Sequence, residues 1–409
     1  MKRWFASPLW LRVIVAMALG IAVGLALGES ATAIRWIGDL FIRAIRMLVV
    51  PLIFFSLVAG VAALGDIAKL GRVGGRALLL FLVTGQIAAW LGIALGLFFA
   101  PGVGVESGGE APPTPAEEVS ITDTILGLVP ENPVMAMAEG QILPLITFSV
   151  LLGVCILLVG REGRGAARFF DTGALLMQKM TFLVMELTPF GVLALMAWVA
   201  GTFGVYGLLP LAALVGLVYL GCMIVLFGVY GLMVTMLGRG SLAAFYRGVI
   251  DVMAVSYSTA SSNATLPVTL QCTQCNLGVS RSVASFVVTL GATINMSGTA
   301  VYLGVVTLFG AQIYGVALGV PQLLTIALLS TLGAVGAAGI PGAGIIMMAL
   351  VFGAVGVPLE VIALVAGVDR LMDMIRTTTN VTGDAAIALV VARQTGELDV
   401  EELESADDV

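Results

Sequence analysis

The chain has 409 residues, of which 59% are hydrophobic and only 11% are charged, and its formal net charge is -6. Such apolarity indicates an all-α polytopic membrane protein, and the long continuous apolar runs exclude a membrane barrel of alternating strands. The sequence has no histidine and no cluster of basic residues, which excludes histidine-dependent hydrolases, histidine-ligated metal centres and a nucleic-acid surface.

Apolar segments long enough to cross a bilayer fill the first part of the chain, at residues 8–27, 34–64, 77–99, 142–159, 170–199 and 208–237. Basic residues precede the first segment and follow the second, fourth and sixth, whereas the connection between the third and fourth carries only acidic charges. Because basic residues stay in the cytoplasm, we expect a cytoplasmic amino terminus and a multi-pass place in the plasma membrane, the inner membrane of a prokaryote. The expected units are spans 1 and 2 in residues 1–76, span 3 in 77–100, an extracellular acidic loop in 101–138, spans 4 and 5 in 139–206, and span 6 in 207–240.

Two later segments have centres that lipid cannot surround. Residues 241–276 have a polar centre closed by a proline, Ser256–Pro267, and residues 320–356 have a glycine-rich centre, Gly333–Gly344. We interpret each as a re-entrant helical hairpin whose turn leaves backbone groups for ligands. Tight packing of glycine-rich helices is the alternative, and it leaves the polar centre of the first segment unexplained.

Each hairpin precedes a span with a polar centre. These spans are residues 277–310, which we expect to be a broken span 7, and residues 357–393, which are span 8, followed by an acidic cytoplasmic tail at 394–409. The separation of Pro267 from Asn295 equals that of Pro341 from Asp369. The matching offset predicts inverted repeats, and transporters bind substrate and ions at the interface of such repeats.

Span 7 is interrupted by Gly291–Thr299. The side chains of Thr293, Asn295 and Thr299, with carbonyls freed by an unwound segment, are hard neutral oxygen ligands. Together with a carboxylate such as that of Asp384, they suit a monovalent cation.

Span 8 carries the polar residues Asp369, Asp373, Arg376, Asn380 and Asp384, whose spacing places them on one face of a helix. A charged side chain near the bilayer centre costs at least ~2.5 kcal/mol, so this stripe faces protein, water or a ligand. A functional site is the first interpretation of the stripe, and a structural ion-pair network between helices is the alternative.

Four motifs in this chain are similar to those of the dicarboxylate/amino acid:cation symporters, the family of archaeal aspartate transporters and excitatory amino-acid transporters. The resemblance extends over roughly residues 10–393, and its motifs are Ser261–Thr269, Asn295–Thr299, Gly339–Gly344 and Asp369–Asp384. It implies eight transmembrane helices plus two re-entrant helical hairpins, an elevator-type transporter and a homotrimer. It also implies that the scaffold spans stay fixed while the hairpins move with spans 7 and 8.

The resemblance assigns roles by position. Asp373 would bind the substrate's amino group and Arg376 its distal carboxylate. The residues assigned to substrate binding are Ser261, Ser262, Asn263, Thr299, Gly342, Gly344, Asp373, Arg376, Thr377 and Asn380. Those assigned to sodium are Gly291, Thr293, Asn295, Asn380 and Asp384, with second-hairpin carbonyls at Ala334 and Ala337. Sodium ions would serve as coupling ions, and we expect no other cofactor.

The chain departs from the family pattern at a deep cation site. Ser297 stands where the family has an aspartate, and Thr84 is followed by Gly85 where the family has a serine. The paired loss predicts coupling to fewer sodium ions than the family norm. Independent drift, with water or Gln86 completing the site, is the alternative, and a proton carried by Asp369 or Asp384 could also replace the missing ion.

The predicted function is therefore symport of acidic amino acids, aspartate or glutamate, with sodium. A buried counter-ion such as Asp373 suits an ammonium group, which a plain dicarboxylate lacks. Alternatives within the family are proton-coupled glutamate/aspartate symport and symport of C4-dicarboxylates or neutral amino acids. An intramembrane aspartyl protease lacks support, since neither a Tyr-Asp pair nor a Gly-x-Gly-Asp turn is present, and a channel would not concentrate its substrate.

Overall fold

The computed structural model describes residues 8–63, 71–105, 126, 129–336, 339 and 341–404. These residues are almost entirely helical, and extended pairing among them is limited to one bridge between Val279 and Leu398. Most of the expected acidic loop and the last residues of the expected tail lie outside the described residues.

The first half of the chain forms a series of long helices. They are α2 (Leu9–Leu27), η1 (Gly28–Ile34), α3 (Arg35–Ala63), α5 (Arg72–Phe99), α7 (Pro133–Glu139), α8 (Ile142–Val159), α9 (Arg164–Met185), α10 (Thr188–Met223), η2 (Ile224–Val229) and α11 (Tyr230–Met236). The apolar run 170–199 is divided after Met185, because Pro189 occupies the first turn of α10 and cannot donate a helical hydrogen bond there. Helix α10 has a kink at Gly204, where φ is 62°. The kink separates the end of the apolar run 170–199 from the start of the run 208–237.

The second half is more broken. Its helices are α12 (Leu242–Gly248), α13 (Ile250–Thr259), α14 (Ser262–Cys275), α15 (Arg281–Ile294), α16 (Ser297–Ile313), α17 (Val320–Gly336), α18 (Ala343–Val355), α19 (Val361–Ala366), α20 (Asp369–Thr395) and α21 (Val400–Glu404). The turn between α13 and α14 places Ala260 in the left-handed region, and Ser261 then caps α14 by accepting a hydrogen bond from the Ala264 amide. The pairs α13–α14 and α17–α18 are each packed together as a helical hairpin.

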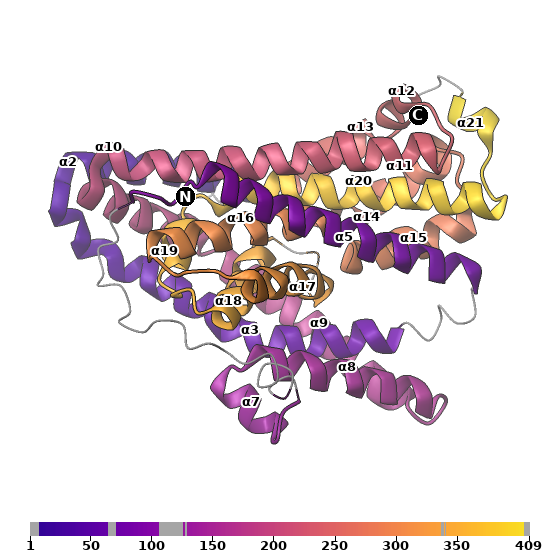
Figure 1. The fold of residues 1–409 in the computed structure, drawn as a ribbon, viewed down its shortest axis with the longest axis horizontal. Coiled ribbons are helices and arrows are strands. Elements are labelled where there is room, and N and C mark those ends of the chain that lie inside the picture. The colour runs from indigo at the N-terminus through magenta and orange to yellow at the C-terminus, as the bar shows by residue number, and fades with distance from the viewer. Residues whose placement is uncertain are drawn as a thin grey trace.

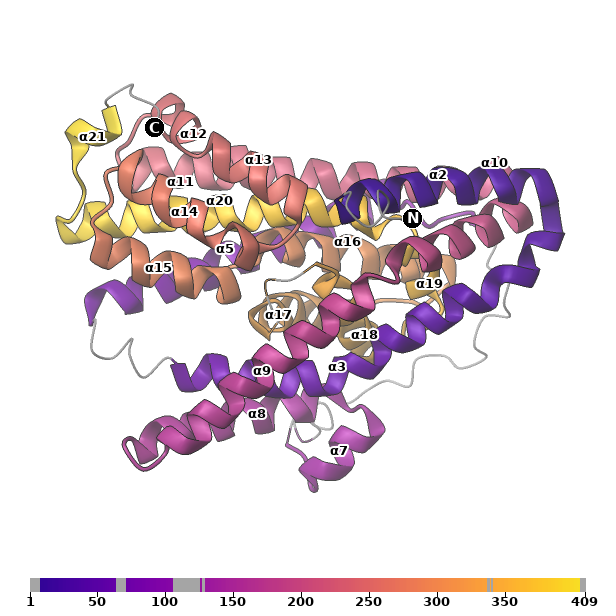
Figure 2. The same ribbon diagram turned by 180° about the vertical axis from the view of Figure 1, so that it is seen from behind.

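The hairpin α17–α18 lies between two groups of helices in both views (Figures 1 and 2). On one side are α3, α8 and α9, and on the other are α5, α16 and α20. Both α17 and α18 contact α3, and α17 also contacts α5 and α16. Helix α2 packs along α10.

Four helical stretches within the described residues are long and apolar enough to cross a membrane. In three of them, Leu9–Ala62, Arg72–Phe99 and Thr188–Met236, less than half of the most apolar window is buried within the protein, as expected of a lipid-facing helix. The fourth, Arg281–Ile313, is 100% buried over that window and combines α15 and α16. Among these four stretches, the one with the most buried window is therefore the one that is broken between α15 and α16.

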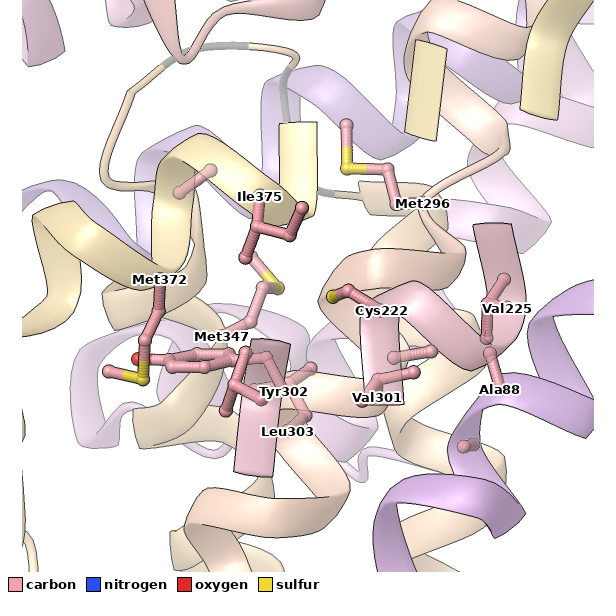
Figure 3. Close-up of a cluster of buried hydrophobic side chains, with 14 of the residues drawn as sticks. Ala88, Cys222, Val225, Met296, Val301, Tyr302, Leu303, Met347, Met372 and Ile375 are labelled. Atoms are coloured by element: carbon pink, nitrogen blue, oxygen red, sulfur yellow. The ribbon is translucent and has the colours of Figure 1, made fainter. Parts of the chain in front are cut away.

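The apolar core converges on α16 and α20. Figure 3 shows Tyr302 of α16 beside Met347 of α18 and Met372 of α20, with Cys222 of α10 nearby. Gly92 of α5 lies so close to the Val301 carbonyl of α16 that a side chain there would overlap the backbone. This close packing surrounds the polar face of α20 with tightly fixed neighbours.

Candidate functional site

The polar stripe of α20 is buried along its whole length. The residues Asp369, Asp373, Arg376, Asn380 and Asp384 are between 1% and 6% exposed. A buried charge needs a partner, and the partners divide the stripe into a charged cluster at its amino-terminal end and a carboxylate–amide cluster deeper in the helix.

Arg376 is the centre of the charged cluster. Its Nη1 donates to Asp369 Oδ1 at 2.9 Å, and its Nη2 donates to Asp373 Oδ1 at 2.6 Å. The guanidinium carbon lies 3.8 Å from the ring centre of Tyr302, within the range of a cation–π contact. Two carboxylates and an aromatic face thus fix the plane of the guanidinium, and a fixed guanidinium presents paired donors suited to a carboxylate.

Asp373 connects the cluster to the second hairpin. Its Oδ2 accepts a 3.0 Å hydrogen bond from the backbone amide of Gly342, which precedes α18 and has φ of 80°. Gly344, in the first turn of α18, lies against the Arg376 guanidinium, where a methyl group would approach Nη1 to 2.5 Å. The amino-terminal end of α18 therefore offers backbone donors beside both charged residues.

The first hairpin reaches the same region through its turn. Ser261 Oγ donates to the Gly339 carbonyl at 2.9 Å, and the Asn263 amide donates to the same oxygen at 3.0 Å. Ser262 is buried and its Cβ lies against Gly339. The tips of the two hairpins therefore meet beside the charged cluster, although they are far apart in sequence.

A small cavity borders Asp369, Arg370 and Asp373. Its opposite wall includes Met185 of α9 and Thr188 of α10. The charged cluster thus lies at the boundary between α18 and α20 on one side and the helices around α9 and α10 on the other.

The deeper cluster is built around the break between α15 and α16. Asn295, at the break, donates from Nδ2 to Asp384 Oδ1 at 2.9 Å and to the Asn380 carbonyl at 3.3 Å. Asn380 Oδ1 accepts a 2.8 Å hydrogen bond from the Gly298 amide, and Ser297 Oγ donates to Asn295 Oδ1 at 3.3 Å. Gly291 lies directly against the Asp384 carboxylate. The cluster offers one carboxylate with amide and carbonyl oxygens, a set that suits a monovalent cation.

The described residues contain no group of three or more His, Cys, Asp or Glu side chains that could hold a metal ion.

Other residues expected at cation sites contact their own helices or α17. The Thr84 hydroxyl donates to the Leu80 carbonyl of its own helix at 2.8 Å, and the Thr293 hydroxyl donates to the Leu290 carbonyl at 3.0 Å. Gly85 lies against Thr331 of α17. Ala337 and the side chain of Ala334 lie outside the described residues.

The remaining substrate-binding candidates are on α16 and α20. Thr299 Oγ1 accepts from Asn380 Nδ2 at 3.4 Å, which links the break in span 7 to the stripe. Thr377 is buried next to Arg376 in α20.

Three residues at the site were not singled out by the sequence. Tyr302 follows Thr299 by one helical turn, a spacing that could have indicated it. Arg370 precedes Asp373 by three residues, which places the two side chains together on a helix. Tyr230, whose hydroxyl lies against Gly383 of α20, sits in an apolar run that gives no signal of a polar neighbour.

Comparison with known proteins identifies the family of the chain. Residues 9–394 match the sodium:dicarboxylate symporter family. The chain is 36% identical to the proton/glutamate-aspartate symporter of Escherichia coli, over 96% of this chain and 94% of that protein. It is 32% identical to the proton/sodium-glutamate symport protein of Geobacillus stearothermophilus, over 95% of each chain. It is 34% identical to a C4-dicarboxylate transport protein of Bacillus subtilis, over 96% of this chain and 94% of that protein. The chain therefore belongs to the sodium:dicarboxylate symporter family, a family of transporters and not of enzymes.

Proposed function

We propose that this protein is a secondary active symporter that carries aspartate or glutamate across the inner membrane together with sodium. The observation that carries the proposal is the buried pair of Asp373 and Arg376, one helical turn apart and in contact at 2.6 Å. An acidic amino acid has an ammonium group for the first residue and a side-chain carboxylate for the second. A plain dicarboxylate would leave Asp373 without a cationic group of the substrate.

The other polar groups would complete the substrate site. Thr299, Thr377 and Asn380 would donate or accept hydrogen bonds along the substrate, while backbone amides near Gly342 and Gly344 would bind a carboxylate. The turn of the first hairpin, at Ser261, Ser262 and Asn263, would contribute from the opposite side. The contact of both hairpin tips beside Arg376 supports this arrangement.

Sodium would bind at the deeper cluster of Asn295, Asp384 and the Asn380 and Gly291 carbonyls. A second ion would bind near Thr293 and the backbone of the second hairpin. The support is the single carboxylate among neutral oxygens, since a monovalent cation needs charge compensation and short, hard ligands.

The names of the relatives support symport of acidic amino acids, and they name two coupling ions, sodium and the proton. The protein of Geobacillus stearothermophilus is named for both proton and sodium coupling, and the protein of Escherichia coli is named for proton coupling. Proton coupling is therefore the second candidate, and the serine at position 297, where the family pattern has an acidic residue, is the observation that favours it.

We further propose that the hairpins move together with α16 and α20 against a fixed scaffold that includes α2, α3, α8 and α9. The second hairpin would be the gate, because the glycines around its tip allow a short loop to open. The amino terminus would be cytoplasmic, and three copies would assemble through the scaffold.

Purified protein in sealed proteoliposomes would test the function. Labelled aspartate and glutamate should accumulate inside the vesicles when the sodium concentration is high outside. Unlabelled succinate should inhibit this uptake only weakly. Imposing a proton gradient without sodium separates the two coupling candidates. Accumulation driven equally well by protons alone would refute sodium coupling. Uptake that stops at equal concentrations inside and outside would refute active transport.

A further inference from the structure

The charged cluster contains a second buried guanidinium, that of Arg370, which is 8% exposed. Its Nη2 donates to the backbone carbonyl of Thr259 at 3.2 Å, and its Nη1 lies 3.7 Å from Asp373 Oδ2. Thr259 ends α13, so the guanidinium also lies at the negative end of that helix. The residue is thus anchored by backbone and carboxylate, within the same cluster as Arg376.

The four charged side chains of the cluster balance one another. Asp369 and Asp373 contribute two negative charges, and Arg370 and Arg376 contribute two positive charges. All four are more than 90% buried, so water screens these charges weakly. Each carboxylate lies near a guanidinium, whose charge stabilises the ionised form.

We propose that Arg370 is a built-in counter-cation, which keeps the substrate cluster neutral when the carrier has released its substrate. The transport unit could then return across the membrane with no additional cation bound at this cluster. This inference rests on the proposed transport function, and it names a residue that would determine the return step rather than bind substrate.

The assignment to Arg370 rather than Arg376 follows from their partners. Arg376 contacts both carboxylates and lies beside the backbone of α18, where a substrate carboxylate would bind. Arg370 donates to a carbonyl of the first hairpin, so its guanidinium has a protein partner apart from the carboxylates. Removing Arg370 would leave one uncompensated negative charge in the substrate-free cluster, and moving such a charge through a low-dielectric layer is costly.

Asp384 is not part of this balance. It lies in the deeper cluster, paired with Asn295, and its charge belongs to the proposed sodium site. The charge that Asp384 contributes is the same with and without Arg370. A comparison of variants at position 370 therefore reports on the charged cluster alone.

Two modes of transport by the purified protein separate the return step from the rest of the cycle. Net uptake into substrate-free vesicles requires the substrate-free carrier to return, whereas exchange into vesicles preloaded with unlabelled aspartate does not. For Arg370→Gln we expect net uptake to fall at least ~tenfold while exchange falls no more than ~threefold, because the loaded carrier also holds the positive charge of the coupled sodium ions and the returning empty carrier does not. Arg370→Lys should restore the ratio, and potassium inside the vesicles should partly restore net uptake by Arg370→Gln.

Arg12→Gln is the matched control. Arg12 is also buried and pairs with Glu186 at 2.7 Å, but it lies on α2, outside the cluster. We expect this variant to affect both modes equally. Wild-type protein gives a second measurement that does not depend on how the variants fold, since its net uptake should be independent of internal potassium.

Equal loss of both modes in Arg370→Gln, without rescue by lysine, would show a structural role and overturn the inference. Unchanged net uptake in Arg370→Gln, or a wild-type requirement for internal potassium, would also overturn it. Wild-type protein that exchanges no acidic amino acid would instead refute the proposed function on which the inference rests.

Discussion

The backbone amide of Gly342 donates a 3.0 Å hydrogen bond to the carboxylate of Asp373. The tip of the second hairpin and the residue proposed to bind the substrate ammonium are therefore in direct contact. An ammonium group that binds Asp373 would share or replace this hydrogen bond. Under the proposed function, substrate binding and the position of the hairpin tip would be coupled through one carboxylate.

The role of Asp373 is tested by Asp373→Asn, which keeps the acceptor for Gly342 and removes the charge. We expect aspartate and glutamate to bind more weakly by ~2 to 5 kcal/mol, because an ammonium loses its buried counter-ion. Inhibition of labelled uptake by aspartate and by succinate measures the difference. Asp369→Asn, which removes the charge of the other carboxylate that contacts Arg376, should weaken both compounds alike. The assignment fails if Asp373→Asn weakens succinate as much as aspartate.

Arg376→Ala should abolish tight binding of every acidic substrate. The carboxylates of Asp369 and Asp373 would then lose the buried positive charge that both of them contact. Lysine at this position would keep the charge and lose the paired donors, so we expect Arg376→Lys to recover only part of the affinity. Direct binding measured by calorimetry on detergent-purified protein distinguishes the two variants. Aspartate affinity unchanged in Arg376→Ala would disprove the assignment.

The gate assignment is tested by a disulfide between Ile345→Cys on α18 and Ala366→Cys at the end of α19. Both residues border the same cavity beside Asp373, and fixing them together should hold the hairpin tip in place. Oxidation should stop uptake, and reduction should restore it. The four native cysteines are unpaired, so they are first replaced by serine, and each single-cysteine variant serves as a control. Full uptake with the disulfide complete would show that the tip is not the gate.

The stripe on α20 shows how far sequence reasoning extends. The spacing of Asp369, Asp373, Arg376, Asn380 and Asp384 follows the helical period, so their common face could be predicted from the sequence alone. Which carboxylate pairs with Arg376 could not be predicted, because positions three and seven residues before it both face the same side. The structure has Arg376 donating to both.

Contacts between distant segments could not be predicted from the sequence, for a different reason. The absence of a side chain at Gly85 allows a close approach to Thr331, and the approach is visible only when α5 and α17 are placed together. The polar centre of residues 256–267 indicated a turn between helices. It did not reveal that Ser261 and Asn263 bind the carbonyl of Gly339 in the other hairpin.

The carboxylate of Glu397 holds the chain end against the α14–α15 connection. Ser280 and Ser282 each donate a 2.7 Å hydrogen bond to it, and these bonds lower the pKa of Glu397 from its ordinary value of 4.5. A lowered pKa stabilises the folded contact at pH values above the ordinary one and ceases to do so as the pH falls through the lowered value. The protection factors of the Ser280 and Asp399 amides, which correct for the intrinsic pH dependence of exchange, should therefore fall on acidification below the ordinary pKa. In Glu397→Gln, the protection factors should be low at all pH values, and pH-independent protection in the wild type would contradict the expectation.

The sodium site is tested by Gly291→Ala. A methyl group on Gly291 would overlap the Asp384 carboxylate, which would have to move away from Asn295. We expect the sodium concentration for half-maximal uptake to rise at least ~tenfold, as expected when a buried charged contact is lost. Gly216→Ala is the control, because it adds the same methyl group to a helix with no atom within 4 Å. Equal sodium dependence in the two variants would exclude Gly291 and Asp384 from the sodium site.

Ser297 occupies the altered deep cation site. Ser297 Oγ donates to Asn295 Oδ1 at 3.3 Å, so an aspartate here would bring a second carboxylate to the cluster around Asp384. Without that second carboxylate, an additional sodium ion beside the one proposed at Asp384 would depend on neutral oxygens alone, which is unfavourable by several kcal/mol. Ser297→Asp should therefore add a coupled sodium ion, and Ser297→Asn, which has the same shape without the charge, should not.

The serine hydroxyl missing at position 85 would be added next to Thr331. A methyl group on Gly85 would lie 3.0 Å from Thr331 Cγ2, which is a tight contact, so Gly85→Ser is combined with Thr331→Ser, which removes that methyl and keeps the hydroxyl. We expect the triple variant with Ser297→Asp to bind the added ion more tightly than Ser297→Asp alone, since Thr84 and the new serine supply neighbouring oxygens. Reversal potentials of aspartate uptake under set sodium and electrical gradients give the number of coupled ions. The same number in wild type, Ser297→Asn and the triple variant would show that the loss of the carboxylate has not changed the coupling.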